Sequence, residues 1–351
     1  MIAALRLRIA LVVLAVALAP PVLRADDVDD FVRARMAEFH VPGLSLAVIR
    51  DGQIVKAEGY GVANAATRTP VRPETIFKIG SVSKQFIATG IMLLVQDGRL
   101  SVDDPIGRFL DGTPPSWSRI TLRHLLAHTS GLVREAPTFD PFKTQSDADL
   151  LRSAYDVPLR FEPGTKWEYC NTGYFALAEV IRRASGQPWS EFLEARIFKP
   201  LGMGDTRVTH PDPRPSRSLG YTGEDNSRVA DDWTAVRPSG AFVSTVLDLA
   251  RWDKALDDRS ILTDASVRQM WTPVQLSDGT TYPYGFGWEL APFRGLRRVQ
   301  HGGSMPGFRS NYFKLPDERL TIILLTNAED VDRDGILAGL ASRLLPAARL
   351  R

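Results

Sequence analysis

The chain has 351 residues, with 43 Lys and Arg against 41 Asp and Glu, so its formal net charge is +2 at pH 7. This near-neutral balance, without a long run of like charge, excludes the basic face that a nucleic-acid-binding protein needs. The length predicts one large domain or two closely packed ones. A single cysteine, Cys170, excludes an intramolecular disulfide, so the fold depends on its hydrophobic core.

The first 25 residues predict a cleavable secretory signal. Arg6 and Arg8 precede the apolar run Ile9–Ala19, and prolines and the small residue Ala25 follow it. An uncleaved anchor is the less favoured alternative, because the apolar run is short for a membrane-spanning helix. Cleavage removes three arginines and no acidic residue, which brings the net charge to about −1. We expect a secreted or periplasmic protein with no stable membrane span after cleavage.

The N-terminal part of the chain predicts a helix, a hairpin and a second helix. Apolar residues have helical spacing over Val28–Phe39. Alternating segments, Gly43–Ile49 and Gln53–Gly59, flank Asp51-Gly52, a pair suited to a tight hairpin turn. From Ser83 the apolar period changes to 3.6 and continues until Asp97-Gly98, which predicts an amphipathic helix.

The rest of the chain predicts helices in the middle and strands near the end. Helical patterns occupy Leu122–Ala127, Asp147–Ala154, Thr172–Ala184, Trp189–Ile197, Val243–Leu256 and about Arg333–Leu345. Strand-like segments occupy Tyr284–Leu290, Arg297–His301, Asn311–Leu315 and Thr321–Thr326.

Strands at both chain ends with helices between them predict an α/β (α+β) fold. Its sheet combines strands from both ends, flanked by helices, in a domain of residues 26–98 and 238–351. Residues 99–237 form a mainly helical insertion domain. The segment Ile322–Leu325 is apolar at every position, as in a central strand that is buried on both faces.

Ser81-Val82-Ser83-Lys84 lies at the start of the second helical pattern. A serine three residues before a lysine puts both side chains on one face of a helical turn. There the amine can take the hydroxyl proton, and the backbone N–H of Ser81 points toward developing negative charge. This spacing alone is a weak signal for a serine nucleophile, and its weight comes from the motifs that follow.

Tyr169-Cys170-Asn171 precedes the helix that opens at Thr172. Tyr169 and Asn171 are two residues apart in an extended segment, so both can reach one pocket. A tyrosine near an ammonium group can be held as phenolate and act as a base. The alternative for Tyr169 is a loop residue bonded to backbone, and Cys170 is interpreted as a packing residue, with a reactive thiol as the minor alternative.

His301-Gly302-Gly303-Ser304 ends a predicted strand. The glycines allow close approach of a substrate, and the Ser304 N–H is placed to serve as an oxyanion donor. A glycine-rich turn is the alternative. A zinc site on His124 and His128 is disfavoured because the glutamate of the His-Glu-x-x-His motif is absent, so no metal or other cofactor is expected.

Five segments, in chain order, resemble motifs of the serine β-lactamase-related family: Ser81-x-x-Lys84, Leu125–Leu132, Tyr169-x-Asn171, Gly240–Thr245 and His301-x-Gly303. This family groups class C β-lactamases, D-alanyl-D-alanine carboxypeptidases and several esterases and aminopeptidases. The resemblance covers about residues 28–327. It implies the β-lactamase/transpeptidase-like fold, with an antiparallel sheet and a helical insertion.

The resemblance also implies a role for each matched residue. Ser81 would be the acylated nucleophile, Lys84 its partner in proton transfer, and Tyr169 the general acid or base. The division of proton transfer between Lys84 and Tyr169 is left open. The remaining implied assignments concern substrate: Asn171 binds a substrate amide and helps to fix Lys84, the N–H groups of Ser81 and Ser304 form the oxyanion hole, and His301, Gly302 and Gly303 line the site.

The segment His301-Gly302-Gly303 departs from the Lys-Thr-Gly of class C β-lactamases. Histidine is largely neutral at pH 7, and glycine lacks the threonine hydroxyl, so anchoring of a substrate carboxylate is weakened. We therefore expect an esterase or peptidase-like serine hydrolase that forms an acyl-enzyme on a small-molecule or peptide substrate.

Two alternatives to this function are kept. One is a class C-like β-lactamase or D-alanyl-D-alanine carboxypeptidase, and the other is a non-catalytic penicillin-binding sensor or scaffold. Specificity is expected to depend on the loops Arg134–Ser146 and Pro211–Arg237, where Tyr221, Trp233 and Arg237 are candidate cleft residues. The oligomeric state is left open.

Overall fold

The computed structural model describes residues 25–208, 216–240 and 242–346, so the predicted signal segment, apart from Ala25, lies outside the described residues. Within these residues the α-helices are α1 Ala25–Glu38, α2 Lys84–Gln96, α3 Leu122–Leu126, α4 Asp147–Arg152, α5 Thr172–Ser185, α6 Trp189–Leu193, α7 Val246–Asp258, α8 Asp264–Met270 and α9 Arg333–Leu344. The strands there are β1 Gly43–Arg50, β2 Gln53–Asn64, β3 Thr69–Pro70, β4 Phe77–Lys78, β5 Arg207–Val208, β6 Tyr221–Thr222, β7 Arg228–Val229, β8 Phe242–Ser244, β9 Val274–Gln275, β10 Thr281–Tyr282, β11 Val299–Met305, β12 Phe308–Leu315 and β13 Leu320–Thr326.

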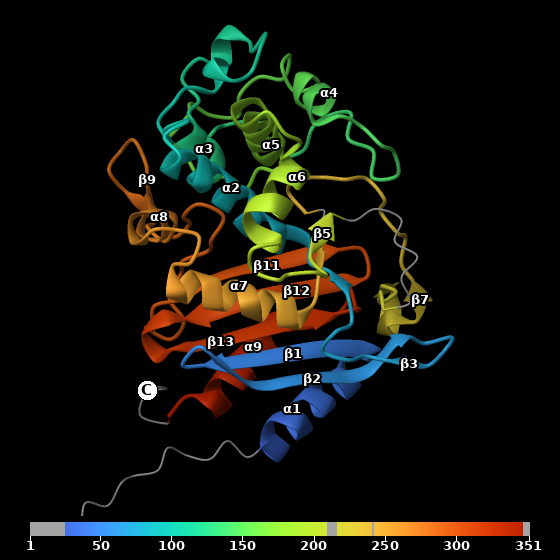
Figure 1. Ribbon diagram of the computed structural model, residues 1–351. Coiled ribbons are helices and arrows are strands. Elements are labelled where there is room, and N and C mark those ends of the chain that lie inside the picture. Colours follow the sequence, from blue (N-terminus) through green and yellow to red (C-terminus); the bar gives the residue numbers. More distant parts are fainter. Residues whose placement is uncertain (1–24, 209–215, 241, 347–351) are drawn as a thin grey trace, which may run out of the picture.

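The main sheet is built from both ends of the chain, as predicted. Its order is β11-β12-β13-β1-β2-β3, and all neighbours are antiparallel. N-terminal β1 lies between β2 and C-terminal β13, with Leu44 opposite Thr326 (Figure 1). The β1–β2 hairpin turns at Asp51-Gly52, where both residues have positive φ (52° and 74°), as a type I′ turn requires.

Helices cover both faces of this sheet. Along β1, Leu44, Leu46 and Val48 belong to the hydrophobic cluster that contains α1 and α9, whereas Ala47 and Ile49 belong to the cluster that contains α7. Successive side chains of a strand point to opposite faces, so one strand serves both clusters. Figure 1 shows α1 and α9 together at one side of the sheet, away from α7.

Helices α2 to α6 and the loops between them form the helical part of the molecule, which packs around α2 and α5. It lies beyond β11, at one edge of the main sheet (Figure 1). The larger hydrophobic cluster is continuous between the two parts, because it contains Phe86 of α2, Leu177 of α5 and Ile323 of β13. Helix α2 is buried on nearly every side, which explains why its sequence is apolar beyond a single stripe. This core holds the start of α2 rigidly beside the sheet.

Local structure differs from prediction in four places. The helix expected from Val243 begins at Val246, because Thr245 caps it by accepting from the Asp248 N–H, and residues 242–244 pair as β8 with β4 and β5. The expected strand Tyr284–Leu290 makes only isolated bridges. The helix predicted over Trp189–Ile197 changes to a π-helical turn at Glu194–Phe198, and α8 was not predicted.

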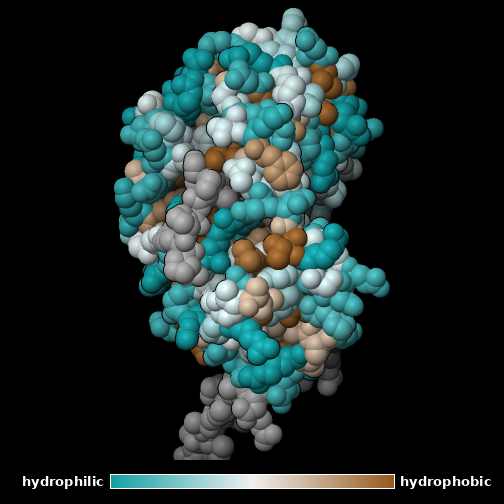
Figure 2. Space-filling view, turned by 90° about the vertical axis from the view of Figure 1, so that its right-hand side faces the viewer, coloured by the Kyte–Doolittle hydropathy of each residue, from teal (hydrophilic) through white to brown (hydrophobic). Residues whose placement is uncertain are grey.

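Among the helices described here, none is both long and apolar enough to cross a bilayer. Figure 2 shows a face on which hydrophilic residues surround a small central group of hydrophobic ones. The large apolar side chains that are exposed include Ile54, Val55, Phe142, Leu219 and Val229.

Candidate active site

Ser81 lies in a 3-10 turn, Gly80–Ser83, immediately before α2. Side chains at i and i+3 of a 3-10 helix eclipse each other, so Ser81 faces Lys84, the first residue of α2. The Lys84 Nζ lies 3.2 Å from Ser81 Oγ. The expected pairing of these two side chains is present, although the turn that provides it is 3-10 rather than α-helical.

The surroundings of Lys84 favour a neutral amine. The residue is fully buried, and its Nζ donates to Asn171 Oδ1 and to the carbonyl oxygen of Ser239, both at 2.8 Å. Burial lowers the pKa of Lys84 well below its ordinary value, and the Arg237 guanidinium acts in the same direction. A neutral amine has two N–H groups and one lone pair. Asn171 and Ser239 take the two N–H groups, which leaves the lone pair for the hydroxyl of Ser81.

Tyr169 lies beside this pair, with its ring centroid 4.7 Å from Lys84 Nζ. Burial raises the pKa of the Tyr169 phenol, and a side-chain hydrogen bond with Ser81 opposes this effect only in part. The structure therefore favours the neutral phenol over the phenolate that the sequence suggested. A neutral phenol beside the serine hydroxyl is a proton donor rather than the first base.

Asn171 extends the hydrogen bonds of Lys84 to Glu135 and, through it, to Arg237. Its Nδ2 donates to the carboxylate of Glu135, and the guanidinium of Arg237 lies 3.3 Å from Glu135 Oε2. The amide oxygen of Asn171 is thus oriented toward Lys84. Only Arg237 of this outer pair was a candidate, since nothing in the local sequence of Glu135 distinguishes it from other loop carboxylates.

The backbone of the nucleophile turn lies directly against β11. Gly80 has φ +50°, and a Cβ placed there would be 2.7 Å from the Ser304 nitrogen. A Cβ on Gly303 would be 2.0 Å from the carbonyl oxygen of Ile79. Only glycine permits this approach at both positions. The peptide of Ser304 is thereby brought next to the turn that carries Ser81, as an oxyanion hole formed by these two residues requires.

These residues line a cleft of about 410 Å³, which contains all the predicted site residues except Lys84 and Gly303. Its lining consists of Ser81, Arg134, Glu135, Tyr169, Asn171, Trp233, Arg237, Ser239, Gly240, Glu289, His301, Gly302, Ser304, Met305 and Arg333. Lys84 is fully buried behind Ser81, whose Oγ it contacts. Gly303 is also buried, at the point where β11 contacts the backbone of Ile79. Tyr221 is not in the lining, since its hydroxyl accepts from the Ala65 N–H.

A family model described as Beta-lactamase matches residues 28–345. The chain belongs to the β-lactamase family. The recognition of the β-lactamase-related serine hydrolases from sequence motifs, and the fold that it implied, are confirmed.

Similar proteins in the β-lactamase family include penicillin-binding proteins and D-aminopeptidases. Penicillin-binding protein 4* of Bacillus subtilis is 33% identical over 84% of this chain and 70% of its own length. A D-aminopeptidase of Gluconobacter oxydans is 29% identical over 84% of this chain, which spans only 58% of that relative.

Solved structures with the same fold include a penicillin-binding protein homologue and a D-amino acid amidase. An octameric penicillin-binding protein homologue from Pyrococcus abyssi has a TM-score of 0.82 at 29% identity, covering 92% of this chain and 77% of its own. The D-amino acid amidase from Ochrobactrum anthropi SV3, complexed with D-phenylalanine, has a TM-score of 0.77 at 25% identity, covering 91% and 99%.

His301 of this β-lactamase-family protein is buried, and both of its ring nitrogens have partners within the protein. Nδ1 faces the Gly302 carbonyl oxygen at 2.7 Å, and Nε2 faces the Tyr284 hydroxyl at 2.9 Å. Burial lowers the pKa of His301 to about 4, so the ring is neutral at pH 7. The sequence predicted that this position, a lysine in class C β-lactamases, carries no fixed positive charge here, and the neutral ring agrees with that prediction.

Gly302 nevertheless has a cation beside it. A Cβ on Gly302 would lie 2.4 Å from a guanidinium nitrogen of Arg333, which comes from the start of α9. The space left by the missing side chain is therefore occupied by a positive charge at the wall of the cleft. This replacement was not visible in the sequence, because Arg333 is thirty-one positions from Gly302.

Two other residues weighed in the sequence, Cys170 and His124, have structural roles. Cys170 is buried, its thiol donates to the Val133 carbonyl oxygen at 3.3 Å, and burial raises its pKa to about 12, so it is a packing residue. His124 accepts from the Thr121 N–H at the start of α3. Within the described residues, no group of three or more His, Cys, Asp or Glu side chains is arranged to hold a metal ion.

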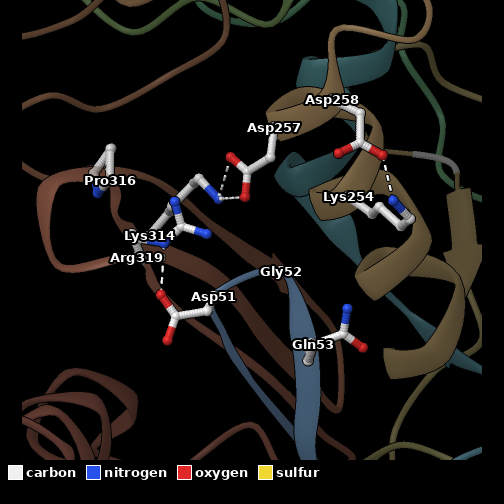
Figure 3. Close-up of a pocket in the computed structure, with 9 residues that line it drawn as sticks. All are labelled: Asp51, Gly52, Gln53, Lys254, Asp257, Asp258, Lys314, Pro316 and Arg319. Carbon is white, nitrogen blue, oxygen red and sulfur yellow. Dashed lines mark hydrogen bonds and ion pairs between the residues drawn. The ribbon is translucent and has the colours of Figure 1, made fainter.

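A second cavity, of about 370 Å³, lies at the hairpin end of β1 and β2, beside the end of α7 (Figure 3). Its charged side chains pair with each other: Arg319 with Asp51, Lys314 with Asp257, and Lys254 with Asp258. These pairs leave no charge that calls for a ligand, so the cleft around Ser81 is the candidate active site.

Proposed function

We propose that this protein hydrolyses amide or peptide bonds of small substrates through an acyl-enzyme at Ser81. The single observation that carries this proposal is the contact of Ser81 Oγ with the buried amine of Lys84, whose two N–H groups are taken by other acceptors. A serine beside a neutral amine is an activated nucleophile.

In the acylation step, Lys84 takes the proton of the Ser81 hydroxyl as Oγ attacks the substrate carbonyl. The negative charge on the carbonyl oxygen is stabilised by the backbone N–H groups of Ser81 and Ser304. Tyr169, as a neutral phenol, donates a proton to the departing amine and is reprotonated from Lys84. The bond between the carbonyl carbon and the leaving nitrogen breaks, and an ester to Ser81 remains.

In the hydrolysis step, a water molecule replaces the amine. Lys84 and Tyr169 act together as the base that removes the water proton, and the ester bond to Ser81 breaks with return of a proton to Oγ. Asn171 holds Lys84 in place throughout, because its Oδ1 accepts from Nζ at 2.8 Å. The order of proton transfers is a property of the Lys84–Tyr169 pair rather than of one residue.

The relatives named D-aminopeptidase and D-amino acid amidase support an amide or peptide substrate over a simple ester. The cleft itself supports a small substrate with polar ends. It contains the guanidinium groups of Arg134 and Arg333 and the carboxylate of Glu289, all at its walls. Each can pair with a charged end of an amino-acid derivative or short peptide.

A second candidate function is penicillin or peptide-carboxylate recognition. The observation that favours it is Arg333, which fills the space beside Gly302 and supplies a cation where the sequence indicated none. Similarity to penicillin-binding proteins supports the same candidate. If Arg333 binds a substrate carboxylate, Arg333→Ala weakens binding of carboxylate-bearing substrates by roughly ten- to a hundredfold and leaves uncharged esters unaffected.

We also propose that the protein is secreted or periplasmic and that residues 26–98 and 238–351 form the sheet domain around the insertion 99–237. The composition of residues 1–25 supports the first proposal, and the positions of the helices and strands support the second. A small-molecule or peptide substrate is the proposed partner.

Intact-protein mass spectrometry tests the nucleophile and the substrate class together. The wild type and Ser81→Ala are incubated with a fluorophosphonate, D-phenylalanine p-nitroanilide, a p-nitrophenyl ester and nitrocefin. We expect a covalent adduct and p-nitroaniline release in the wild type, and neither in Ser81→Ala. The matched control is Ser118→Ala, which removes an exposed hydroxyl of the helical part.

Labelling that survives in Ser81→Ala would show that another residue is the nucleophile. Nitrocefin turnover faster than anilide turnover would favour the second candidate. A folded wild type that reacts with none of the four compounds would favour the non-catalytic sensor or scaffold.

A further inference from the structure

Tyr284 joins the two walls of the cleft through two buried histidines. Its hydroxyl lies 3.1 Å from His128 Nε2 and 2.9 Å from His301 Nε2. His128 follows α3 in the helical part of the chain, whereas His301 is in β11 of the main sheet. All three side chains are at most 1% exposed. The catalytic steps proposed above use none of these three groups.

Each histidine has a backbone partner at its Nδ1, and these two partners fix the direction of the hydrogen bonds to Tyr284. The Cys170 backbone N–H donates to His128 Nδ1 at 3.2 Å, so this nitrogen carries no proton and the neutral ring is protonated on Nε2. His301 Nδ1 faces the Gly302 carbonyl oxygen, which can only accept, so Nδ1 carries the proton and Nε2 accepts. Tyr284 therefore accepts from His128 and donates to His301.

Each histidine supports one wall of the cleft. The His128 ring packs on the Tyr169 ring with centroids 4.3 Å apart, and its Nδ1 holds the peptide between Tyr169 and Asn171. His301 holds the Gly302 carbonyl in the strand that also carries Ser304. One phenol hydroxyl thus connects the segment of the proposed acid–base tyrosine with the strand of the proposed oxyanion donor.

We propose that Tyr284 is a positioning residue that sets the spacing between Tyr169 and Ser304 by holding His128 and His301 as two defined neutral tautomers. The kinetic part of this proposal rests on the proposed function, whereas the tautomers do not.

Burial and the neighbouring guanidinium groups of Arg333 and Arg134 favour the neutral forms of the two rings. His301 faces the side chains of Lys84, Tyr169, Glu289 and Arg333. Among these groups only the carboxylate of Glu289 favours the imidazolium. His128 faces Lys84, Arg134, Tyr169, Cys170 and Tyr174. Burial lowers both histidine pKa values, and the acceptor pattern explains why protonation is disruptive. A proton on His128 Nδ1 would meet the Cys170 N–H, and one on His301 Nε2 would meet the Tyr284 O–H.

The tautomers are tested by long-range proton–nitrogen NMR on the histidine rings of the uniformly labelled protein at pH 7. His128→Gln and His301→Gln assign the signals. We expect His128 protonated on Nε2 and His301 on Nδ1. The opposite tautomer or an imidazolium at either ring would overturn the proposal. This measurement needs no substrate, so it tests the two tautomers even if the proposed hydrolase activity is absent.

The positioning role is tested with Tyr284→Phe, which removes only the hydroxyl. We expect kcat to fall at least ~10-fold with KM changed far less, because the reacting groups are displaced while the cleft wall remains. We also expect the acid limb of the kcat/KM profile to move up by about half to one pH unit, since His301 Nε2 loses its donor and protonates more readily. Tyr60→Phe, which removes a hydroxyl bonded to Asp29 of α1, is the matched control.

A Tyr284→Phe enzyme with the wild-type rate and pH profile would overturn the proposal. If this variant does not fold, His301→Gln decides, because the glutamine oxygen can accept from Tyr284 and cannot be protonated at these pH values. Its acid limb should lose the contribution of His301. An unchanged acid limb in folded His301→Gln would overturn the proposal.

Discussion

The chemistry proposed for this protein depends on the charge state of Lys84. Its Nζ is surrounded by acceptors from Asn171 and Ser239 and by the rings of Tyr169 and Tyr174, at 4.7 and 5.2 Å. Aromatic faces attract a cation, but complete removal from water costs more. The amine consequently has a lowered pKa and can accept the serine proton at neutral pH.

Lys84→Arg should therefore abolish acylation although it keeps a basic side chain. A guanidinium does not lose its proton in this pH range, so we expect the rate of Ser81 acylation to fall by about 10³-fold or more. Stopped-flow measurement of adduct formation with the fluorophosphonate checks this. Lys254→Arg, at an exposed ion pair with Asp258, is the control. A Lys84→Arg rate within tenfold of wild type would contradict a neutral lysine base.

At the scale of elements, the site depends on the contact of β11 with the 3-10 turn before α2. The carbonyl oxygen of Ile79 accepts from the Ser310 hydroxyl of β12 at 2.7 Å, and Gly303 leaves room for this contact. Neither element alone contains the site: the turn carries the nucleophile, and the strand carries the second peptide N–H.

Gly303→Ala should separate these two elements. The new Cβ would lie 2.0 Å from the Ile79 oxygen, so the strand must shift, and we expect a loss of about 1–3 kcal/mol in the free energy of unfolding. Activity should fall more than stability predicts, because the oxyanion geometry changes. Urea unfolding and anilide hydrolysis measure the two effects. Gly204→Ala, where a Cβ meets nothing within 4 Å, should change neither. A fully active Gly303→Ala would refute this contact as a determinant of the site.

At the scale of the whole molecule, the sheet and the helical part share one core. The larger hydrophobic cluster includes Ile49 and Ile323 of the sheet together with Leu126 and Leu177 of the helical part. Two bodies that share a continuous core lose contacts together when either one unfolds. The division at residues 99 and 237 therefore stays a prediction about architecture, and the core makes a separate prediction about cooperativity.

We expect a single cooperative unfolding transition for the protein. Calorimetry should give equal calorimetric and van't Hoff enthalpies, and hydrogen exchange should show α5 and β13 opening together. Two separate transitions would instead indicate that residues 99–237 fold as an independent domain.

Stability should also depend on pH through the buried histidines. Burial lowers the pKa of His128, and that of His301 to about 4, whereas an unfolded histidine titrates near ~6.5. The unfolded chain then binds more protons as the pH falls from ~6.5 toward 4, so these two groups destabilise the fold over that window and have no effect above it. Asp147 acts in the opposite direction, because burial raises its pKa to about 7.

Comparison of wild type with His128→Gln isolates the histidine contribution. Thermal melts from pH 4.5 to 8 should give a smaller loss of Tm at acid pH in His128→Gln. The exposed His40 provides the control His40→Gln, whose pH dependence should follow wild type. Identical pH dependence in His128→Gln and wild type would show that His128 does not resist protonation in the fold.

The sequence alone determined the family, the two-ended sheet and the short-range pairing of Ser81 with Lys84. These features depend on local spacing: period-2 and period-3.6 apolar patterns, the Asp51-Gly52 turn, and the i, i+3 relation of a helical turn. The Tyr169-x-Asn171 and His301-x-Gly303 motifs could likewise be recognised from residue type and order.

Only the tertiary structure decided which distant groups complete the cleft. Glu135 orients Asn171, Arg333 fills the space beside Gly302, and Tyr284 joins His128 to His301, all across long separations in the chain. It also decided the neutral state of Tyr169, since burial rather than a neighbouring charge dominates its pKa. Local spacing specifies which residues share a face, whereas long-range packing determines which faces meet and how much water remains between them.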